Sequence, residues 1–598
     1  MKFLKIFLAA LLAVVAGGIL SSIFWFMIFM GFIGTSSSSV TVAPESILKI
    51  DLAENITDSP TVNPLSGFDF MSMEATPSLP LFKVLQAIDA AAQDDRIKGI
   101  YLRMNGGGGL ESAAMEEMRD ALENFKQSGK FIYAYNETYS QGAYYLASVA
   151  DKIYLQKEGS IDWQGMSYTV PFFKGLFDKV GVEYEIFRPT SCKFKSAVEP
   201  YFLKKMSPEN RRQSDEMMTS IWGVIAETVA QARGFESVEE LNRLTDELAL
   251  SLPEDALKHG MVDGLIYEDE MLALFDEAQV ARNDENEFNF VTLGEYAAQL
   301  MPDLENLTSP VVAILYAEGA IVDGEGEEDG TIYGNTLAEQ LAEVRKNDEI
   351  KAVVLRVNSP GGSALASDVV WREMSLLQQQ KPLVVSMGSY AASGGYYISA
   401  PADVILADRM TLTGSIGVFG AFPVVGEMLD KKLGITFDGV KTNANADFGQ
   451  GFLFGMVRPT NPTEHKLLMR SVDKVYDSFT SKVSEGRNLS MEHVLEIAGG
   501  RVWSGVDALK VGLIDSHGGL KAAIAVAAEK AGLENYRVEE QLSELDLFNS
   551  LFSGLGFSVK SHLFENPVIE GLTPYKKALE IYSQQGIVMY LPYHYSFM

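Results

Sequence analysis

Short apolar segments alternate with longer amphipathic segments along most of the chain, and this pattern predicts strands that alternate with helices. Residues 97–104 are largely apolar and indicate a buried strand. The following segment, 111–127, places Ala114, Met118 and Leu122 on one stripe, which predicts a helix with one buried face. A further helix is predicted at 81–93, and further strands at 47–52, 131–135 and 152–155. Strands that alternate with helices indicate an α/β fold with a parallel sheet and crossover helices.

The second half of the chain repeats this order of elements. Strands are predicted at 311–316, 352–357, 383–387 and 404–407, and a helix at 366–379. A turn over 388–393 joins the third of these strands to a short helix. Farther on, the stretch 587–591 is strand-like, but the pattern around it indicates no function.

Three sequence matches indicate that the two halves are copies of one unit. IKGIYLRMN matches IKAVVLRVN, GAYY matches GGYY, and DALKHG matches DALKVG. The pairs begin at Ile97 and Ile350, at Gly142 and Gly394, and at Asp255 and Asp507. Their single register, about 250 residues, is the mark of an internal repeat. We therefore predict one domain at 45–305, a second at 306–535 and a C-terminal extension at 536–598.

The first 35 residues have the pattern of a membrane anchor. Lys2 and Lys5 precede an apolar stretch over residues 7–33, which is long enough to span a bilayer and longer than a signal-peptide core. No convincing cleavage site follows, because the chain continues into the serines at 36–39. Positive charge before the span predicts an N-terminus in the cytoplasm and a body outside. A cleaved signal is the alternative.

Composition narrows the classes of partner and cofactor. The chain has 598 residues and a net charge of −31, which argues against nucleic acid because phosphate binding needs clustered Lys and Arg. Its single cysteine, Cys192, cannot form an internal disulfide and is interpreted as a small packed side chain. No metal-binding or nucleotide-binding motif is present, so the sequence predicts no cofactor.

The two copies differ where chemistry is expected. Ser393 directly precedes the GGYY segment of the second copy, and Gln141 stands at that position in the first. Lys195 of the first copy has no lysine counterpart, because its register in the second falls near Asp447 and Phe448. Each copy therefore holds a side chain that the other lacks.

Ser393 lies where a buried strand turns into a helix, with small residues on both sides that leave room for a substrate. The N-terminal end of a helix favours developing negative charge, which suits a serine nucleophile. Serine before a helix is more commonly an N-cap, so the local sequence by itself favours that structural role.

Gly361 and Gly362 follow the strand that leads to Asn358. Two glycines there can turn their backbone N–H groups into a cavity, and each donor in such an oxyanion hole is worth roughly 2.7–4 kcal/mol in the transition state. An ordinary strand-to-helix turn is the alternative. The glycine run of the first copy, 106–109, has no serine partner in its own copy.

A serine nucleophile needs a base, and histidine is the usual choice. The six histidines have no telling sequence context and are interpreted as surface residues: His259, His465, His493, His517, His562 and His594. Lysine is the other option if burial lowers its pKa and keeps the amine neutral. Lys195 is the candidate, and Lys193 would lower its pKa further unless that side chain points to solvent. The alternative is that Lys195 is itself a solvated surface residue.

Four segments together resemble the family of the signal peptide peptidase SppA, or protease IV, in its long form with tandem domains and an N-terminal anchor. They are KSAVEP at 195–200, SPGG at 359–362, SGGYY at 393–397 and TGSIG at 413–417. The resemblance covers the chain from the anchor to about residue 530. It implies two tandem domains of the Clp protease/crotonase type, built from repeated β-β-α units after one transmembrane helix.

The resemblance also implies roles for individual residues. These are Ser393 as nucleophile, Lys195 as general base, Ser415 as the hydroxyl that orients the lysine amine, and the amides of Gly361, Gly362 and Gly394 as oxyanion donors. The activity implied is a serine endopeptidase that degrades cleaved signal peptides and other short apolar peptides. The implied location is a bacterial inner membrane with the body on the periplasmic side, and the implied assembly is a homotetramer.

Two rival functions remain at the level of the sequence. A crotonase-like acyl-CoA enzyme shares the fold and the paired-amide oxyanion hole but does not need Ser393. A body outside the cytoplasm argues against it, because CoA is a cytoplasmic cofactor. A non-catalytic membrane scaffold could keep the fold without any activity.

Overall fold

We describe the fold from a computed structural model of the chain. The described residues are 42–52, 55–60, 68–69, 74–75, 78–104, 110–300, 308–326, 328–541 and 587–590. The expected membrane span at 7–33, the glycine run at 106–109 and most of the C-terminal extension lie outside these ranges. None of the helices within the described ranges combines the length and apolar character that a membrane crossing requires.

The first copy forms a six-stranded sheet in the order β10-β8-β7-β6-β1-β11, and every neighbouring pair in it is parallel. Its strands are β1 (Ser46–Asp51), β6 (Ile97–Arg103), β7 (Phe131–Tyr139), β8 (Lys152–Ile161), β10 (Gly264–Leu265) and β11 (Phe290–Thr292). Its connecting helices include α2 (Leu81–Gln93), α3 (Ser112–Lys126), α4 (Gln141–Ala147) and α9 (Pro253–Lys258). The apolar runs and stripes of the sequence therefore correctly predicted a parallel α/β unit.

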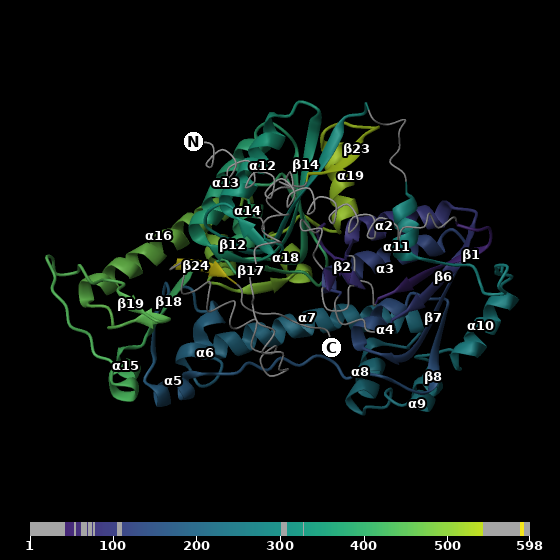
Figure 1. The fold of residues 1–598 in the computed structure, drawn as a ribbon, viewed down its shortest axis with the longest axis horizontal. Helices are drawn as coiled ribbons and strands as arrows, with labels where there is room; N and C mark the ends of the chain where they lie inside the picture. Colours follow the sequence, from purple (N-terminus) through teal and green to yellow (C-terminus); the bar gives the residue numbers. More distant parts are fainter. Residues whose placement is uncertain are drawn as a thin grey trace, which may run out of the picture.

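The second copy repeats these elements within a larger sheet of 14 described strands. Its parallel part contains β12 (Val311–Val322), β14 (Ile350–Ser363), β15 (Leu383–Ala392), β16 (Val404–Ala407) and β22 (Ser516–His517). The matching helices are α13 (Ala364–Gln378), α14 (Gly394–Ser399) and α18 (Gly505–Lys510). Figure 1 shows most of the first copy, in purple, blue and teal, at one end of the molecule, and the second copy, in teal to yellow-green, beside it.

Equivalent hydrogen bonds confirm that the copies share one design. The Tyr144 hydroxyl donates to the Met261 carbonyl at 2.5 Å, and the Tyr396 hydroxyl donates to the Leu513 carbonyl at 2.8 Å. The bonds join α4 to the segment before β10 and α14 to the segment before β22. The internal repeat seen in the sequence therefore extends to equivalent buried hydrogen bonds in the structure.

The strands that approach the candidate site are longer than the sequence predicted. β14 continues through Gly361 and Gly362, and β15 continues to Ala392. The cause is pairing with distant partners, because β12 pairs with β14 as far as Gly362, after a register shift between Glu318 and Ala320, and β17 (Leu412–Gly414) pairs with the end of β15. The two glycines therefore lie in a strand and not in the turn that was the structural alternative.

A segment of the first copy crosses into the second sheet. β9 (Glu183–Phe187) pairs antiparallel with β18 (Phe419–Val424), and the chain continues through η1 (Ser196–Val198) and α6 (Glu199–Phe202). The long helix α7 (Pro208–Arg233) then leads back toward the first copy (Figure 1). This excursion brings Lys195 to the second copy.

A buried ion-pair cluster also joins the copies. Arg356 on β14 is 1% exposed and lies 2.7 Å from Asp58 and 2.7 Å from Glu117. Glu117 belongs to α3 of the first copy, and its other oxygen accepts the backbone N–H of Leu520 at 2.7 Å. The contact therefore links one strand of the second copy to two segments of the first.

Candidate active site

Ser393 occupies the sharp junction between β15 and α14. Its backbone has φ +58° and ψ −112°, and its amide donates to the Gly414 carbonyl at 2.8 Å. A non-glycine residue in such a region carries of order 1–3 kcal/mol of strain, which the surrounding structure must hold. The side chain is fully buried and makes no capping bond to α14. Ser393 therefore stands at the N-cap position of α14 without capping it through its side chain, and the hydroxyl is directed elsewhere.

The Ser393 hydroxyl meets the amine of Lys195. The two atoms, Nζ and Oγ, lie 2.7 Å apart, although the residues are 198 positions apart in the sequence. The lysine segment is bonded to the second copy where the Phe194 amide donates to the Gly499 carbonyl, and Arg188 of the same segment donates to the Lys195 carbonyl at 2.8 Å. The structure thus brings together the two side chains that the separate copies supply.

Ser415 completes the surroundings of the amine. Nζ of Lys195 lies 2.9 Å from the Ser415 carbonyl oxygen and 2.9 Å from its hydroxyl oxygen. That hydroxyl can donate onward to the Gly500 carbonyl, at 3.4 Å, and so accepts from the lysine. A neutral amine has two N–H donors and one lone pair. If Ser415 accepts both donors, the lone pair is directed at the Ser393 hydroxyl.

Burial sets the charge state of this amine. Lys195 is 2% exposed, and the loss of hydration lowers its pKa to about 7. A weaker opposing effect comes from Cys192, which is buried beside it. Within the described residues no carboxylate forms an ion pair with Lys195. The sequence suggested that Lys193 would help to lower the pKa of Lys195. Lys193 is exposed and is not among the causes of the shift, so burial alone lowers this pKa.

The three predicted oxyanion glycines lie beside Ser393. A methyl group built on Gly394 would lie 3.1 Å from the amide nitrogen of Gly362 and 3.1 Å from Cα of Gly361, so the backbones are in close contact. Gly361 has φ +98°, which favours glycine. Its amide donates to the Ser359 hydroxyl at 3.1 Å, and that hydroxyl donates to the Gly319 carbonyl at 2.6 Å.

Several residues that the sequence did not single out hold the lysine segment. Gln213 on α7 donates to the Phe194 carbonyl at 2.9 Å and to the Ser196 hydroxyl at 2.7 Å. Gly500, with φ +83°, packs so closely that an added methyl would lie 2.5 Å from Cβ of Lys195. The pair of glycines at 499–500 is a turn signal in the sequence, but nothing local indicates which distant residue it contacts.

The counterpart of Ser393 in the first copy has a structural role. Gln141 is buried and accepts the backbone N–H of Gly165 at 3.0 Å. Of the six histidines, His562 and His594 lie outside the described residues, and none of the other four is hydrogen-bonded to Lys195 or Ser393. Among the described residues no group of histidine, cysteine or acidic side chains could hold a metal ion.

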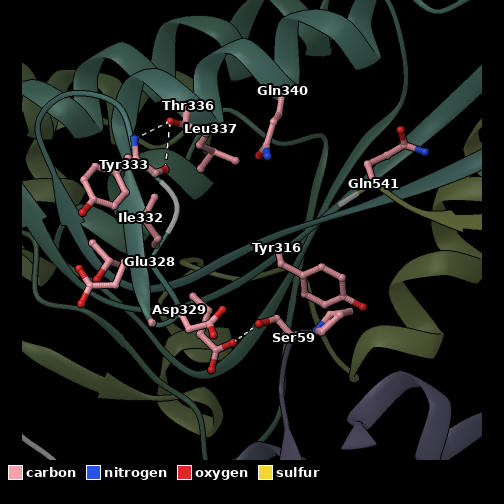
Figure 2. Close-up of a pocket in the computed structure, with 15 residues that line it drawn as sticks. Ser59, Tyr316, Glu328, Asp329, Ile332, Tyr333, Thr336, Leu337, Gln340 and Gln541 are labelled. Carbon is pink, nitrogen blue, oxygen red and sulfur yellow. Dashed lines mark hydrogen bonds between the residues drawn. The ribbon is translucent and has the colours of Figure 1, made fainter. Parts of the chain in front are cut away.

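A separate hollow of about 120 Å³ lies beside β12 (Figure 2). Tyr316, Asp329 and Tyr333 are among its lining residues, and a hydroxyl of Ser59 donates to the buried Glu318 carboxylate there. Burial raises the pKa of Glu318 to about 7. Neither Lys195 nor Ser393 lines this hollow, so it is distinct from the Lys195–Ser393 pair.

Family comparisons match both copies. The family described as "Peptidase family S49" matches residues 124–281 and 375–534, and the family described as "Clp protease" matches residues 306–415. Lys195 and Ser393 fall in different S49 matches, as the repeat of the sequence requires.

Named relatives extend over most of the chain. "Protease 4" of Salmonella typhi is 33% identical over 573 residues, which cover 93% of this chain and 90% of that protein. "Protease 4" of Haemophilus influenzae is 34% identical over 511 residues, which cover 83% and 80%. "Serine protease SPPA, chloroplastic" of Arabidopsis thaliana is 32% identical over 484 residues, which cover 78% and 69%.

Proposed function

The chain belongs to peptidase family S49 and is a serine peptidase, and on that premise we propose that Ser393 and Lys195 form its catalytic dyad. The observation that carries this proposal is the 2.7 Å separation between a buried amine and a buried hydroxyl. Because the amine has a pKa of about 7, a large share of it is neutral near neutral pH and can accept a proton.

The proposed reaction proceeds through an acyl-enzyme. Lys195 removes the proton of the Ser393 hydroxyl as the oxygen attacks a peptide carbonyl, and a tetrahedral intermediate forms. The protonated amine then gives its proton to the departing nitrogen as the C–N bond breaks. In the second half, Lys195 takes a proton from water, the water attacks the ester, and Ser393 regains its proton. Ser415 orients the amine throughout by accepting its N–H groups.

The oxyanion of the intermediate needs donors beside Ser393. We propose the backbone amides of Gly361, Gly362 and Gly394, as the family resemblance implies. Support comes from the close approach of the Gly362 amide to Gly394. The Gly361 amide could take part only when its bond to Ser359 is released or shared.

The division of labour between the domains follows from these roles. In this proposal residues 45–305 supply the general base, residues 306–535 supply the nucleophile, and residues 536–598 form an extension. The excursion that starts at β9 supports the proposal, because it carries the lysine of one domain into the sheet of the other.

We infer cleaved signal peptides and other short apolar peptides as substrates. The apolar stretch at 7–33 would anchor the enzyme in a bacterial inner membrane, with the body on the periplasmic side. Such an anchor would keep the dyad near peptides left in the membrane.

The proposed assembly is a homotetramer. Support comes from an exposed apolar segment, residues 433–454, which we call the apolar arm. Within it Val440 is fully exposed, Leu453 is 67% exposed and Phe454 is 53% exposed. Large apolar side chains gathered on one projecting segment are typical of a protein-protein contact.

A fluorophosphonate probe tests the dyad. We expect the purified chain to be labelled, labelling to be lost in Ser393→Ala, and labelling to fall by at least about 100-fold in Lys195→Ala. Lys193→Ala is the matched control, because that lysine lies two residues away and is exposed. A wild-type chain that is never labelled, or equal labelling of Lys195→Ala and Lys193→Ala, would contradict the proposal. The first outcome would favour the scaffold or the acyl-CoA enzyme, which a CoA-binding measurement then separates.

A further inference from the structure

A strand of the C-terminal extension lies beside the dyad. β24 (Ile587–Tyr590) lies between β14 and β18 and is antiparallel to both. On one side, Gly361, Gly362 and Ser363 are in register with Tyr590, Met589 and Val588. On the other side, Phe419 and Gly420 are in register with Val588 and Ile587. In Figure 1 the label β24 lies beside those of β12, β17 and β18, at the centre of the second copy.

The backbone of β24 reaches the oxyanion glycines. A methyl group built on Gly361 would lie 2.2 Å from the Met589 carbonyl oxygen and 2.6 Å from the Gly394 amide nitrogen. The Met589 carbonyl and the Gly394 amide therefore face the same side of Gly361. Gly394 directly follows Ser393, so a carbonyl of the strand lies in the space toward which a substrate carbonyl must be presented.

This is also the way an extended peptide binds a sheet edge. Main-chain pairing supplies affinity without regard to sequence, and pockets for alternate side chains supply specificity. Met589 is fully buried and packs in the apolar core of the second copy. An incoming peptide could not pair with β14 and β18 at these positions until β24 leaves.

We propose that β24 is an internal pseudosubstrate, a strand that occupies the peptide-binding groove and that substrate must displace. This inference rests on the proposed function, because it takes Ser393 as the reacting residue. The groove is the space between β14 and β18, substrates bind in it antiparallel to both strands, and the position that Met589 fills accepts an apolar side chain.

The covalent link makes the competition effective. β24 follows Gln541 through the 45 residues 542–586, so its binding is intramolecular. A covalent link of this kind gives an effective concentration of about 1 mM, and a strand with a dissociation constant of about 0.1 mM would then lower the apparent activity about tenfold.

Weakening β24 in the full chain tests the proposal. Met589→Asp places a charge in an apolar site, and Val588→Pro removes one backbone N–H of the strand. Either change is expected to raise kcat/KM for an internally quenched apolar peptide by about tenfold. Met491→Asp is the control, because Met491 is a 39% exposed methionine on α17 (Met491–Ile497).

Adding the strand back as a separate peptide gives an independent test of the proposal. The synthetic peptide GIVMYLP, residues 586–592, should inhibit Met589→Asp competitively, and GIVDYLP should not. An unchanged or lower kcat/KM in both β24 variants, with fluorophosphonate labelling intact, overturns the inference and leaves the dyad standing. Absence of both labelling and peptide cleavage in wild type overturns the proposed function itself.

Discussion

Lys195 shows how burial alone can bring the pKa of a lysine near neutral pH. A lysine in water has a pKa near 10.5, and a shift to about 7 corresponds to about 5 kcal/mol of lost hydration for the charged form. Below about pH 7 the free energy of folding must supply this amount, and the cost disappears as pH rises from 7 to the ordinary lysine value near 10.5. Ser415 and Ser393 surround the amine with oxygen atoms, and no carboxylate among the described residues pairs with it, so only the weak effect of Cys192 favours the charged state.

The first prediction concerns pH. The active form of Lys195 is the neutral amine, which is depleted as pH falls through the pKa of about 7. We therefore expect kcat/KM to fall about tenfold per pH unit below 7 and to level off above about pH 8. Lys193→Ala should show the same profile. A rate that stays flat from pH 5.5 to 7.5, or that still climbs at pH 10, would show that Lys195 is not the base.

At the scale of single residues, the sequence predicted which side chains belong to the candidate site better than it predicted the contacts around them. Ser393 and Lys195 were found because each is missing from the other copy and because their surroundings resemble a known family. The Ser359 hydroxyl bonded to Gly361 and the contact of Gly500 with Lys195 were not found. The first contact depends on a side-chain rotamer, and the second joins positions 305 residues apart, and local sequence records neither.

The element next to Lys195 is the turn at 498–501. Gly500 combines a left-handed backbone with a contact that leaves no room for a side chain, since an added methyl would lie 2.5 Å from the lysine Cβ. The second prediction is that Gly500→Ala lowers kcat/KM by at least about tenfold, because the lysine must move and small misplacements of a catalytic group lower rates steeply.

Gly532 provides a matched comparison. It has φ +67° and no neighbour within 4 Å of an added methyl. Gly532→Ala should therefore cost about 1 kcal/mol of stability through the left-handed backbone and leave kcat/KM unchanged. Equal kinetic effects in the two variants would show that backbone strain matters and contact with Lys195 does not. Peptide kinetics and thermal unfolding of each variant measure the two effects separately.

Elements formed by local pattern were predicted well, and elements formed by distant pairing were not. The helix α2 and the strand β16 have the predicted limits, because an apolar stripe and an apolar run define them. The extra length of β14 comes from β12, and β9 joins β18 across 232 residues or more. No pattern within a window of the sequence can show that two edges far apart in the chain are complementary.

At the scale of the whole molecule, one of the contacts that join the copies is a buried ion pair with no buried counterpart in the repeat. Arg356 and Arg103 occupy the same position of the repeat, but Arg356 pairs with Asp58 and Glu117, which are 9% and 4% exposed. Arg103 pairs with Glu137 and Glu268, which are 47% and 54% exposed. The first set is a buried junction between copies, and the second is an ion pair at the surface.

The third prediction compares these arginines. Arg356→Met leaves two carboxylates buried without their partner and should lower stability by about 3–5 kcal/mol. Arg103→Met removes partly solvated pairs and should lower stability by no more than about 1 kcal/mol. Urea unfolding midpoints, followed by circular dichroism, measure both. Similar midpoints for the two variants would mean that the junction contributes little to holding the copies together.

At the scale of the whole molecule, we propose that the apolar arm mediates contact between copies of the chain. It projects beyond α15 (Gly426–Leu433) at the outer end of the second copy (Figure 1), and its 22 residues include only two aspartates and one lysine. In a chain of net charge −31, such a weakly charged segment is where two copies can approach with least repulsion.

The fourth prediction is that Leu453→Ser with Phe454→Ser shifts the full chain in detergent from an oligomer to smaller species. Light scattering corrected for detergent measures this mass. Leu495→Ser, at a 50% exposed leucine on α17, should leave the mass unchanged. If the arm variant keeps the wild-type mass, the copies meet elsewhere and the arm has another partner.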